Sequence, residues 1–491
     1  MDELKSLAKI AVASNNSKQM LPNFNKSSKE GMFYNNLMQD NYMDDAVASM
    51  DLYGSSPNDV KYKMLKVRLK KKLYNSLFFY DKHKLKKAHQ KEQECLHLLH
   101  HAHLLLRLKE PVLVLSTAAK VKKIAVQYEY INFVIAALEL EMDCYSKTGS
   151  INSFLQAKQE LEKYLNIKKY EREAITFLQL LKVKYSKSIK HRRAYLSSIT
   201  DDVDNLYRLW KAAKSFEAFN AYYKASIIFH EMVGDFSAII DLTVSSEDKL
   251  ASGEVNSLRF DSNYNKFILV YAHFRAKQLK EGLQYASKFH SDFEENTPNW
   301  FAYTENYFLI ALHAKEYELA GHLLHKVFTN PHLKRRPAFA RERWTLFQAY
   351  YNLVGGPGSS SNTVNPFLLS LPEYSKDKQG YNVAILVLQF IYFLQKKETE
   401  ALLYRIESLK KYILTHLRDT FSLRSKTFLK LLILTVTQDF DVKTISVKGQ
   451  KLYQKLMDTP APGDAYAEIE IVPYEHLWDH ILSTLEENYN Q

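Results

Sequence analysis

The sequence predicts an all-α protein, folded as a right-handed α-solenoid of antiparallel helix pairs. Apolar residues recur at helical spacing along almost the whole chain, and 46% of the residues are hydrophobic, so a substantial core can be buried. Glycine and proline are scarce, with 13 and 12 among 491 residues, and few tight turns are therefore expected. Long amphipathic helices joined by short polar loops are typical of α-solenoids.

The helical pattern divides the chain into successive elements. Acid pairs such as Asp44-Asp45 and Asp201-Asp202 stand where two of the helices begin, where they favour the helix dipole. The short alternation EIEIV around Glu468 is strand-like, and it is expected to cap the array together with the last helix. In order, the expected helices are 28–39, 42–54, 58–80, 83–108, 111–127, 129–146, 151–164, 168–188, 201–215, 217–233, 236–243, 262–276, 279–292, 299–313, 316–329, 337–353, 380–396, 398–417, 420–437, 445–456 and 474–487.

Four of these helices share a spacing of small and bulky residues. A small residue lets two helices approach closely, the bulky residues after it fill the gap between helix pairs, and a proline ends the helix. The positions are Tyr317, Ala320, Leu324, Val327 and Pro331; Met43, Ala46, Met50, Tyr53 and Pro57; Leu279, Gly282, Ala286 and Phe289; and Phe236 with Ile239.

This spacing resembles the second helix of the tetratricopeptide repeat, in a degenerate form that is strongest between residues 200 and 335. The first helices depart from that family, because its Trp-x-x-Leu-Gly is missing and Val270 and Phe308 stand where a small residue is usual. The chain as a whole is similar to a group of uncharacterised bacterial helical-repeat proteins that end in a motif like IEIVPYEHLWDHI (Ile469–Ile481). These resemblances imply the fold and no particular activity.

A stretch rich in glycine, proline and serine, 355–379, divides the chain. It separates an N-terminal helical-repeat array, 1–354, from a C-terminal helical segment and cap, 380–491. Such a long loop is either a flexible connector or a lid across the concave face of the array.

The positive charge is concentrated in the segment 51–200. This segment holds 29 lysines and arginines against 14 acidic residues, whereas the net charge of the whole chain is +12. Basic clusters suit phosphate backbones or acidic protein partners, but lysine is also the usual residue of a solvated helix face. The candidate basic patch consists of Lys63, Lys66, Lys70, Lys71, Lys187, Lys190, Arg192 and Arg193.

The histidine-rich stretch QECLHLLHHAHLLLRL, residues 93–108, is the one place that resembles a metal site. Glu94, His97 and His101 have the helical spacing of metal ligands, but a second Glu-x-x-His copy is missing. We therefore expect no metal and no cofactor. The histidines are expected to line a half-buried seam between neighbouring helices, where they could respond to pH. The core stripe of this helix is expected to be Cys95, Leu98, Leu99, Ala102, Leu105 and Leu106.

No catalytic site is expected, because the chain contains neither a phosphate-binding loop, a dinucleotide-binding glycine motif, nor a Gly-x-Ser-x-Gly elbow. Cys95 is expected to be buried and inert, and Cys144 to be more exposed beside acidic neighbours that raise the pKa of its thiol. Two cysteines without metal spacing favour a reducing, cytoplasmic compartment. The longest apolar stretch, Val383–Leu394, is shorter than the roughly 20 residues of a membrane span, so no membrane association is expected.

The sequence therefore predicts a non-catalytic scaffold or adaptor that binds a protein or peptide partner in its concave groove. Tyrosine suits recognition because its ring is rigid and its tip is polar, and first helices line the groove of this architecture. The alternative is a nucleic-acid-binding helical-repeat protein that acts through residues 51–200, with an affinity that falls steeply as salt rises. The candidate partner-binding residues are Tyr223, Tyr264, Asn265, Tyr271, Tyr303, Asn306, Tyr307 and Arg341.

Overall fold

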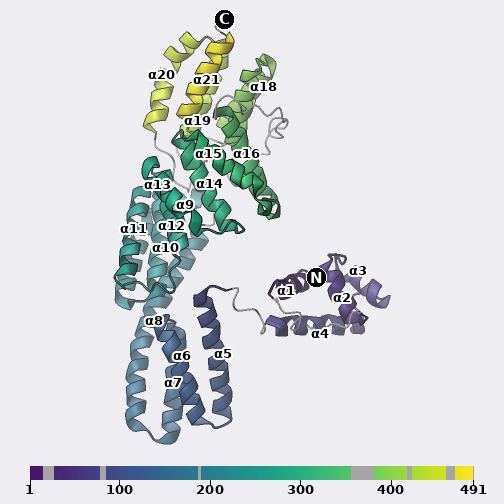
Figure 1. Ribbon diagram of the computed structural model, residues 1–491, viewed down its shortest axis with the longest axis vertical. Helices are drawn as coiled ribbons and strands as arrows, with labels where there is room; N and C mark the ends of the chain where they lie inside the picture. The colour runs from purple at the N-terminus through teal and green to yellow at the C-terminus, as the bar shows by residue number, and fades with distance from the viewer. Residues whose placement is uncertain are drawn as a thin grey trace. The chain divides into compact units, whose positions relative to one another are not determined.

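The computed structural model describes residues 1–14, 27–77, 85–185, 189–354, 381–416, 423–459 and 470–489. Within these ranges the chain forms 21 α-helices, two short 3₁₀-helices and no β-strand (Figure 1). The prediction of an all-α protein is confirmed. The chain divides into two compact units, Met1–Leu165 and Asn166–Gln491, and the division falls within the long helix α8.

The helix bounds follow the chain in order. They are α1 (Asp2–Ser14), α2 (Lys29–Met38), α3 (Asp45–Tyr53), α4 (Val60–Ser76), α5 (Lys87–Arg107), α6 (Pro111–Gln127), α7 (Ile131–Thr148), α8 (Ile151–Tyr185), α9 (Ile189–Ala213), α10 (Phe216–Val233), α11 (Phe236–Ala251), α12 (Ser262–Arg275), α13 (Leu279–Phe289), η3 (His290–Asp292), α14 (Pro298–His313), α15 (Tyr317–Thr329), η4 (Pro331–Arg335), α16 (Ala338–Val354), α17 (Tyr381–Gln395), α18 (Thr399–His416), α19 (Leu423–Thr437), α20 (Val442–Asp458) and α21 (Tyr474–Tyr489).

In the first unit, α1–α4 enclose one apolar core and α5–α7 enclose another with the start of α8. The hydroxyl of Tyr62 in α4 donates a hydrogen bond to Asp45 at the start of α3. Asp44 caps α3 by accepting from the backbone N–H groups of Ala46 and Val47, as its place at a predicted helix start suggests. Asp44 therefore has the structural role expected for it.

In the second unit, helix α14 is enclosed by its neighbours. Every side chain of α14 from Tyr303 to His313 is buried except that of Glu305. The helices before and after it in the chain, α13 and α15, bury one face each. A Cβ atom at Gly282 would lie 3.2 Å from the Cβ atom of His273, so glycine permits the expected close approach of α13 to α12. The same spacing in α3 leaves Met43 and Met50 exposed, so there it does not mark a helix contact.

One turn geometry recurs between successive helices. In eight turns of the described ranges, the residue after the helix has a positive φ and its N–H bonds to the carbonyl three residues earlier. The next N–H bonds to the carbonyl five residues before it, which is the Schellman pattern. The positive-φ residues are Asp40, Lys109, Glu129, Gly234, Lys277, Lys315, Lys397 and Asp439.

Several predicted helix boundaries are wrong. Helix α9 begins at Ile189 instead of residue 201, so Asp201 and Asp202 lie within the helix and not at its start, and helix α1 lies outside the predicted helices. The expected break between 151–164 and 168–188 does not exist, because α8 runs through Leu165–Asn166–Ile167 without a glycine or proline to stop it. Helix α11 continues to Ala251 instead of ending near residue 243, and the hydroxyls of Ser245 and Ser246 bond back to the carbonyl of Leu242 within it.

The predicted loop 355–379 lies outside the described residues. Glu468 and Ile469 of the strand-like piece also lie outside them, whereas its other residues, 470–472, are described and form no strand, so that expectation is wrong there. The described residues on both sides of the loop contribute to one apolar core. Trp344 and Phe347 of α16 belong to it, and so do Phe390 of α17 and Phe428 of α19.

Candidate functional site

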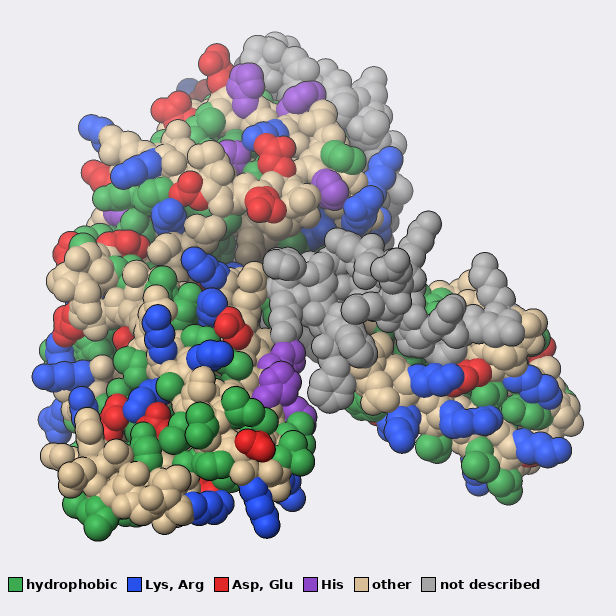
Figure 2. Space-filling model, turned by 60° about the horizontal axis from the view of Figure 1, so that its bottom comes forward, with side chains coloured by type: hydrophobic (Ala, Val, Ile, Leu, Met, Phe, Trp, Pro, Cys, Tyr) green, Lys and Arg blue, Asp and Glu red, His purple; other side chains and the backbone are tan. Residues whose placement is uncertain are grey.

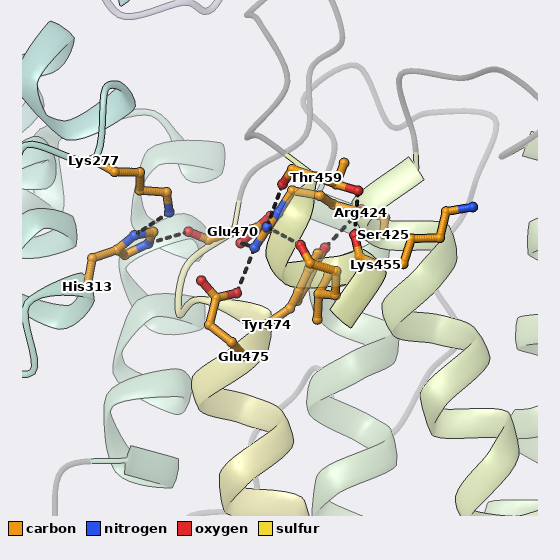
Figure 3. A network of polar contacts seen from close by, with 10 residues as sticks. Lys277, His313, Arg424, Ser425, Lys455, Thr459, Glu470, Tyr474 and Glu475 are labelled. Carbon is orange, nitrogen blue, oxygen red and sulfur yellow. Dashed lines mark hydrogen bonds and ion pairs between the residues drawn. The ribbon is translucent and has the colours of Figure 1, made fainter. Parts of the chain in front are cut away.

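A cluster of charged and polar side chains joins five parts of the second unit (Figure 3). Arg424 comes from the start of α19, and Glu475 from the first turn of α21. Glu470 lies in the segment just before α21. His313 ends α14, and Lys277 occupies the positive-φ turn between α12 and α13.

The guanidinium of Arg424 is almost completely enclosed, with 4% of the residue exposed. Its Nε donates to Glu470 Oε1 at 2.5 Å, and its Nη2 donates to Glu470 Oε2 at 3.0 Å and to Glu475 Oε2 at 2.7 Å. Its Nη1 donates to the backbone carbonyls of Leu456 and Thr459, both at 2.8 Å. An arginine has five N–H donors, and all five are used here. No donor is left for a ligand.

The imidazole of His313 connects α14 to the segment before α21. One ring nitrogen, Nε2, lies 2.9 Å from the carbonyl oxygen of Glu470, which can only accept, so Nε2 carries the proton. The other, Nδ1, lies 3.0 Å from the ammonium of Lys277 and accepts from it. The imidazole is therefore neutral, and both of its nitrogens are used.

The pKa values of the cluster agree with this assignment. Burial lowers the pKa of His313 well below its usual value, and the neighbouring charge of Lys277 lowers it further. Burial opposes ionisation of Glu475, but the charge of Arg424 outweighs it and lowers the pKa of that carboxyl. The same balance raises the pKa of Arg424, because Glu470 and Glu475 more than offset its burial.

The start of α21 is also fixed by Tyr474. Its hydroxyl lies 3.0 Å from the hydroxyl of the buried Ser425, and its ring stacks on Phe428 with centroids 4.5 Å apart. The cluster thus joins the start of α21 to α14, α19 and the end of α20. Because all five donors of Arg424 and both ring nitrogens of His313 are used within the protein, the cluster holds chain segments together.

Most of the predicted partner-binding residues are core residues. Five side chains are buried, Tyr271 is partly buried, and only Tyr264, with 38% of its surface exposed, and Arg341 are exposed. The expectation that the whole set lines an open groove is therefore corrected. The buried five are Tyr223, Asn265, Tyr303, Asn306 and Tyr307.

The buried members have internal partners, which explains their place. The hydroxyl of Tyr223 donates to Asn265 Oδ1 at 2.6 Å, and Asn265 Nδ2 donates to Glu247 Oε1 at 2.6 Å. The hydroxyl of Tyr303 donates to the carbonyl of Ala286 at 3.0 Å. Burial raises the pKa of Tyr223 and of Tyr303. A tyrosine at a first-helix position therefore links helices here.

The predicted basic patch separates into two groups. Lys66 pairs with Asp45 at 2.7 Å, and Lys70 pairs with Glu3 at 2.8 Å. Lys63 and Lys71 are exposed and have no acidic partner within the described ranges. The other four predicted members, Lys187, Lys190, Arg192 and Arg193, lie where the side chains are outside the described residues.

The histidine-rich helix is α5. Its predicted core stripe is confirmed, with Cys95, Leu99 and Ala102 fully buried and the three leucines Leu98, Leu105 and Leu106 packed against the same core. The expected half-buried seam is wrong for three of the histidines, because no described helix covers that side of α5 and their side chains are exposed. These are His100, His101 and His103.

Glu94, His97 and His101, which have the helical spacing of metal ligands, are not assembled as a site. Glu94 pairs with Lys91 at 2.8 Å, and the described residues contain no group of three or more His, Cys, Asp or Glu side chains placed to hold a metal ion. Both cysteines are buried free thiols, so the expectation that Cys144 is exposed is wrong. Burial raises the pKa of Cys95 to about 11, and also raises that of Cys144, to which Asp143 adds.

Sequence reasoning missed the centre of the polar cluster. Arg424 stands in TFSLRSKTF without any spacing signal, since its carboxylate partners are 46 and 51 residues away. The motif IEIVPYEHLWDHI was the available signal, because it contains Glu470, Tyr474 and Glu475. Lys277 occupies a turn and His313 ends a helix, and neither residue has a sequence signature of its own.

No protein-family model, curated protein or solved structure matches the chain. None of the described helices combines the length and the apolar character that crossing a membrane requires.

Proposed function

We propose that the chain is a non-catalytic scaffold or adaptor for a partner protein, built as a right-handed, tetratricopeptide-like α-solenoid of antiparallel helix pairs. The observation that carries this proposal is the Schellman turn that recurs eight times between successive helices. A repeated turn gives successive helices the same relation, and repeated helix pairs generate extended surfaces that act by binding. The polar cluster around Arg424 supports binding over catalysis, because its donors are committed within the protein.

Within the predicted groove set, Tyr264 and Arg341 are the members exposed enough to touch a partner directly. The buried members would act indirectly, by fixing the helices that carry them. We place the protein in a reducing, cytoplasmic compartment, because both thiols are free.

The test is retention of a partner by the purified, tagged full chain from lysate, with and without nuclease, followed by cross-linking to map the contact. A protein that is retained after nuclease and cross-links to the second unit is the expected result. The double variant Tyr264→Ala/Arg341→Ala should weaken retention. Its matched control is Val447→Ala on α20, another exposed position. Recovery of no protein after nuclease would contradict the proposal.

Nucleic-acid binding through residues 51–200 is the second candidate. It is favoured by the exposed lysines of α4 that lack an acidic partner within the described ranges, such as Lys63 and Lys71. Cations of this kind release counterions from a phosphate backbone, so the logarithm of the affinity would fall linearly with the logarithm of the salt concentration. Anisotropy titrations with labelled single- and double-stranded oligonucleotides at several salt concentrations test it. A flat salt dependence would exclude it.

A further inference from the structure

The outward face of α4 combines apolar and basic side chains. The inner face buries Tyr62, Leu65, Leu69 and Leu73 against α1–α3. The opposite face carries Val60, Met64 and Val67, with 70%, 58% and 66% of their surfaces exposed. Spacings of four and three residues place these three side chains in one row along the helix.

The cations of α4 divide by whether another helix supplies an acidic partner. Three on the flanks of the helix are neutralised by other helices: Lys66 by Asp45 of α3, Lys70 by Glu3 of α1 and Lys72 by Glu30 of α2.

Around the helix, Lys71 lies within the apolar row, Lys63 and Arg68 flank it on either side, and Lys61 lies farther round. All four are exposed, and none has an acidic partner within the described ranges. Over α1–α4, Figure 2 shows blue Lys and Arg side chains interspersed with green hydrophobic ones. The four are Lys61, Lys63, Arg68 and Lys71.

We propose that this face of α4 binds an acidic amphipathic helix of a partner protein. Apolar side chains of the partner, spaced three and four residues apart, cover Val60, Met64 and Val67, while its Asp and Glu side chains pair with Lys63, Arg68 and Lys71. The row from Val60 to Val67 is about 10 Å long, so a partner helix of about three turns covers it. Methionine suits such a contact because its side chain is flexible and polarizable. This proposal rests on the proposed scaffold function and names its partner class.

The apolar row decides between the partner classes that a basic face attracts. A phosphate backbone would satisfy the cations but would leave Val60, Met64 and Val67 in water. A helix that lies on a membrane carries large aromatic and leucine side chains on one face and its cations on the other. On α4 the apolar row contains Lys71 and is flanked by Lys63 and Arg68, and this matches the apolar row and acidic flanks of an amphipathic helix.

Binding of labelled synthetic peptides to the full chain tests this, measured by fluorescence anisotropy. The probe is a helix of about 20 residues with leucines at positions i, i+3, i+4 and i+7 and glutamates elsewhere. A second peptide has the same composition in scrambled order, and a third has the leucines replaced by serine. We expect the ordered peptide to bind at least about tenfold more tightly than either of the others, because both groups of contacts are needed.

The variant Met64→Asp/Val67→Asp should lose at least about tenfold in affinity, since it places charge in the apolar row. Val447→Asp, which alters an exposed valine on α20, is the matched control and should bind like the parent chain. The variant Lys63→Gln/Arg68→Gln/Lys71→Gln should also lose affinity, and Lys443→Gln/Lys451→Gln on α20 is its control. All of these side chains are exposed, and melting curves confirm that each variant is folded.

Equal binding of the ordered and scrambled peptides would overturn the proposal. So would an oligonucleotide, or a vesicle containing phosphatidylserine, that binds more tightly than the ordered peptide and is indifferent to Met64→Asp/Val67→Asp. If the parent chain retains a protein from lysate but does not bind the ordered peptide, the scaffold function stands and the α4 site is wrong. If the parent chain retains no protein at all, the scaffold function itself fails.

Discussion

At the scale of single residues, Arg424 shows how a buried charge is kept in this protein. Removing a guanidinium from water costs several kcal/mol, and that cost is offset only where partners and geometry are complete. Glu470 and Glu475 supply the opposite charge, and the carbonyls of Leu456 and Thr459 take the remaining donors. Removing one charged member of this cluster should therefore destabilise the protein, because its partners would remain buried without a counter-charge.

Replacing Arg424 with methionine should lower the free energy of unfolding by about 3–5 kcal/mol, because two carboxylates and two carbonyls lose their donor. Arg424→Lys should cost less, since lysine keeps the charge but has three donors in place of five. Urea unfolding of the full chain measures both. The control Lys430→Met, at an exposed position of the same helix, should change stability little. An unchanged midpoint for Arg424→Met would show that the cluster is not stabilising.

These residue partners could not be predicted from the sequence. Periodicity identifies a buried face, and so it located Cys95, Leu99 and Ala102 correctly. It cannot say which polar side chains meet across the fold. The tyrosines illustrate this limit, because the same ring that suits a binding surface also suits a core. Tyr223 and Tyr303 are buried, and Asn265 and a backbone carbonyl accept hydrogen bonds from their hydroxyls.

At the scale of elements, the recurrent turn places residues other than glycine in a conformation of higher free energy. Four of its positive-φ residues are lysines: Lys109, Lys277, Lys315 and Lys397. A residue with a side chain loses about 1–2 kcal/mol in this conformation, whereas glycine adopts it freely. The turn keeps its geometry because two backbone hydrogen bonds and the packing of the flanking helices hold it.

The variant Lys109→Gly should therefore stabilise the first unit by up to about 1 kcal/mol, after the greater flexibility of unfolded glycine is taken into account. Lys109→Ala removes the same side chain but retains the strained conformation, so it should leave stability nearly unchanged. Chemical unfolding followed by circular dichroism compares the three chains. Equal gains for glycine and alanine would mean that the lysine side chain, and not its backbone, is the source of the effect.

Elements are where the sequence was most informative. The all-α class and most of the helices followed from periodicity and from the scarcity of glycine and proline. The wrong boundaries have a common cause, because polar residues such as Asn166 and Ser245 interrupt an apolar stripe without stopping a helix. The turns could not be predicted from the sequence, since seven of the eight have a residue other than glycine at the positive-φ position.

At the scale of the whole molecule, the buried histidines govern the response to acid. Burial lowers the pKa of six histidines of the second unit, and the neutral ring is therefore favoured in the folded state. When a folded pKa lies below the unfolded value near 6.5, the unfolded chain binds more protons, so stability falls as pH decreases through that range. The six are His230, His273, His290, His313, His476 and His480.

We expect the second unit to unfold at lower temperature or lower urea at pH 5.5 than at pH 7.5. Two carboxyls whose pKa values are raised by desolvation, the buried Glu171 and the partly buried Glu305, work in the opposite direction, but the histidines outnumber them. Thermal melts across this pH range measure the effect. Replacing the exposed His100, His101 and His103 of α5 with glutamine should leave the acid dependence intact. If that replacement removes it, the pH response belongs to α5, as the sequence alone suggested.

The polar cluster is completed late in synthesis. Arg424 and the carbonyls of Leu456 and Thr459 leave the ribosome before Glu470 and Glu475 do, and His313 leaves long before them. Until the later segment emerges, the guanidinium has no carboxylate to neutralise it and the end of α14 lacks its cover. The apolar helices around Arg424 therefore stay incompletely packed until the later segment joins them. A nascent chain that has exposed residue 459 but not yet residue 470 would hold this unit in an incompletely packed, aggregation-prone state.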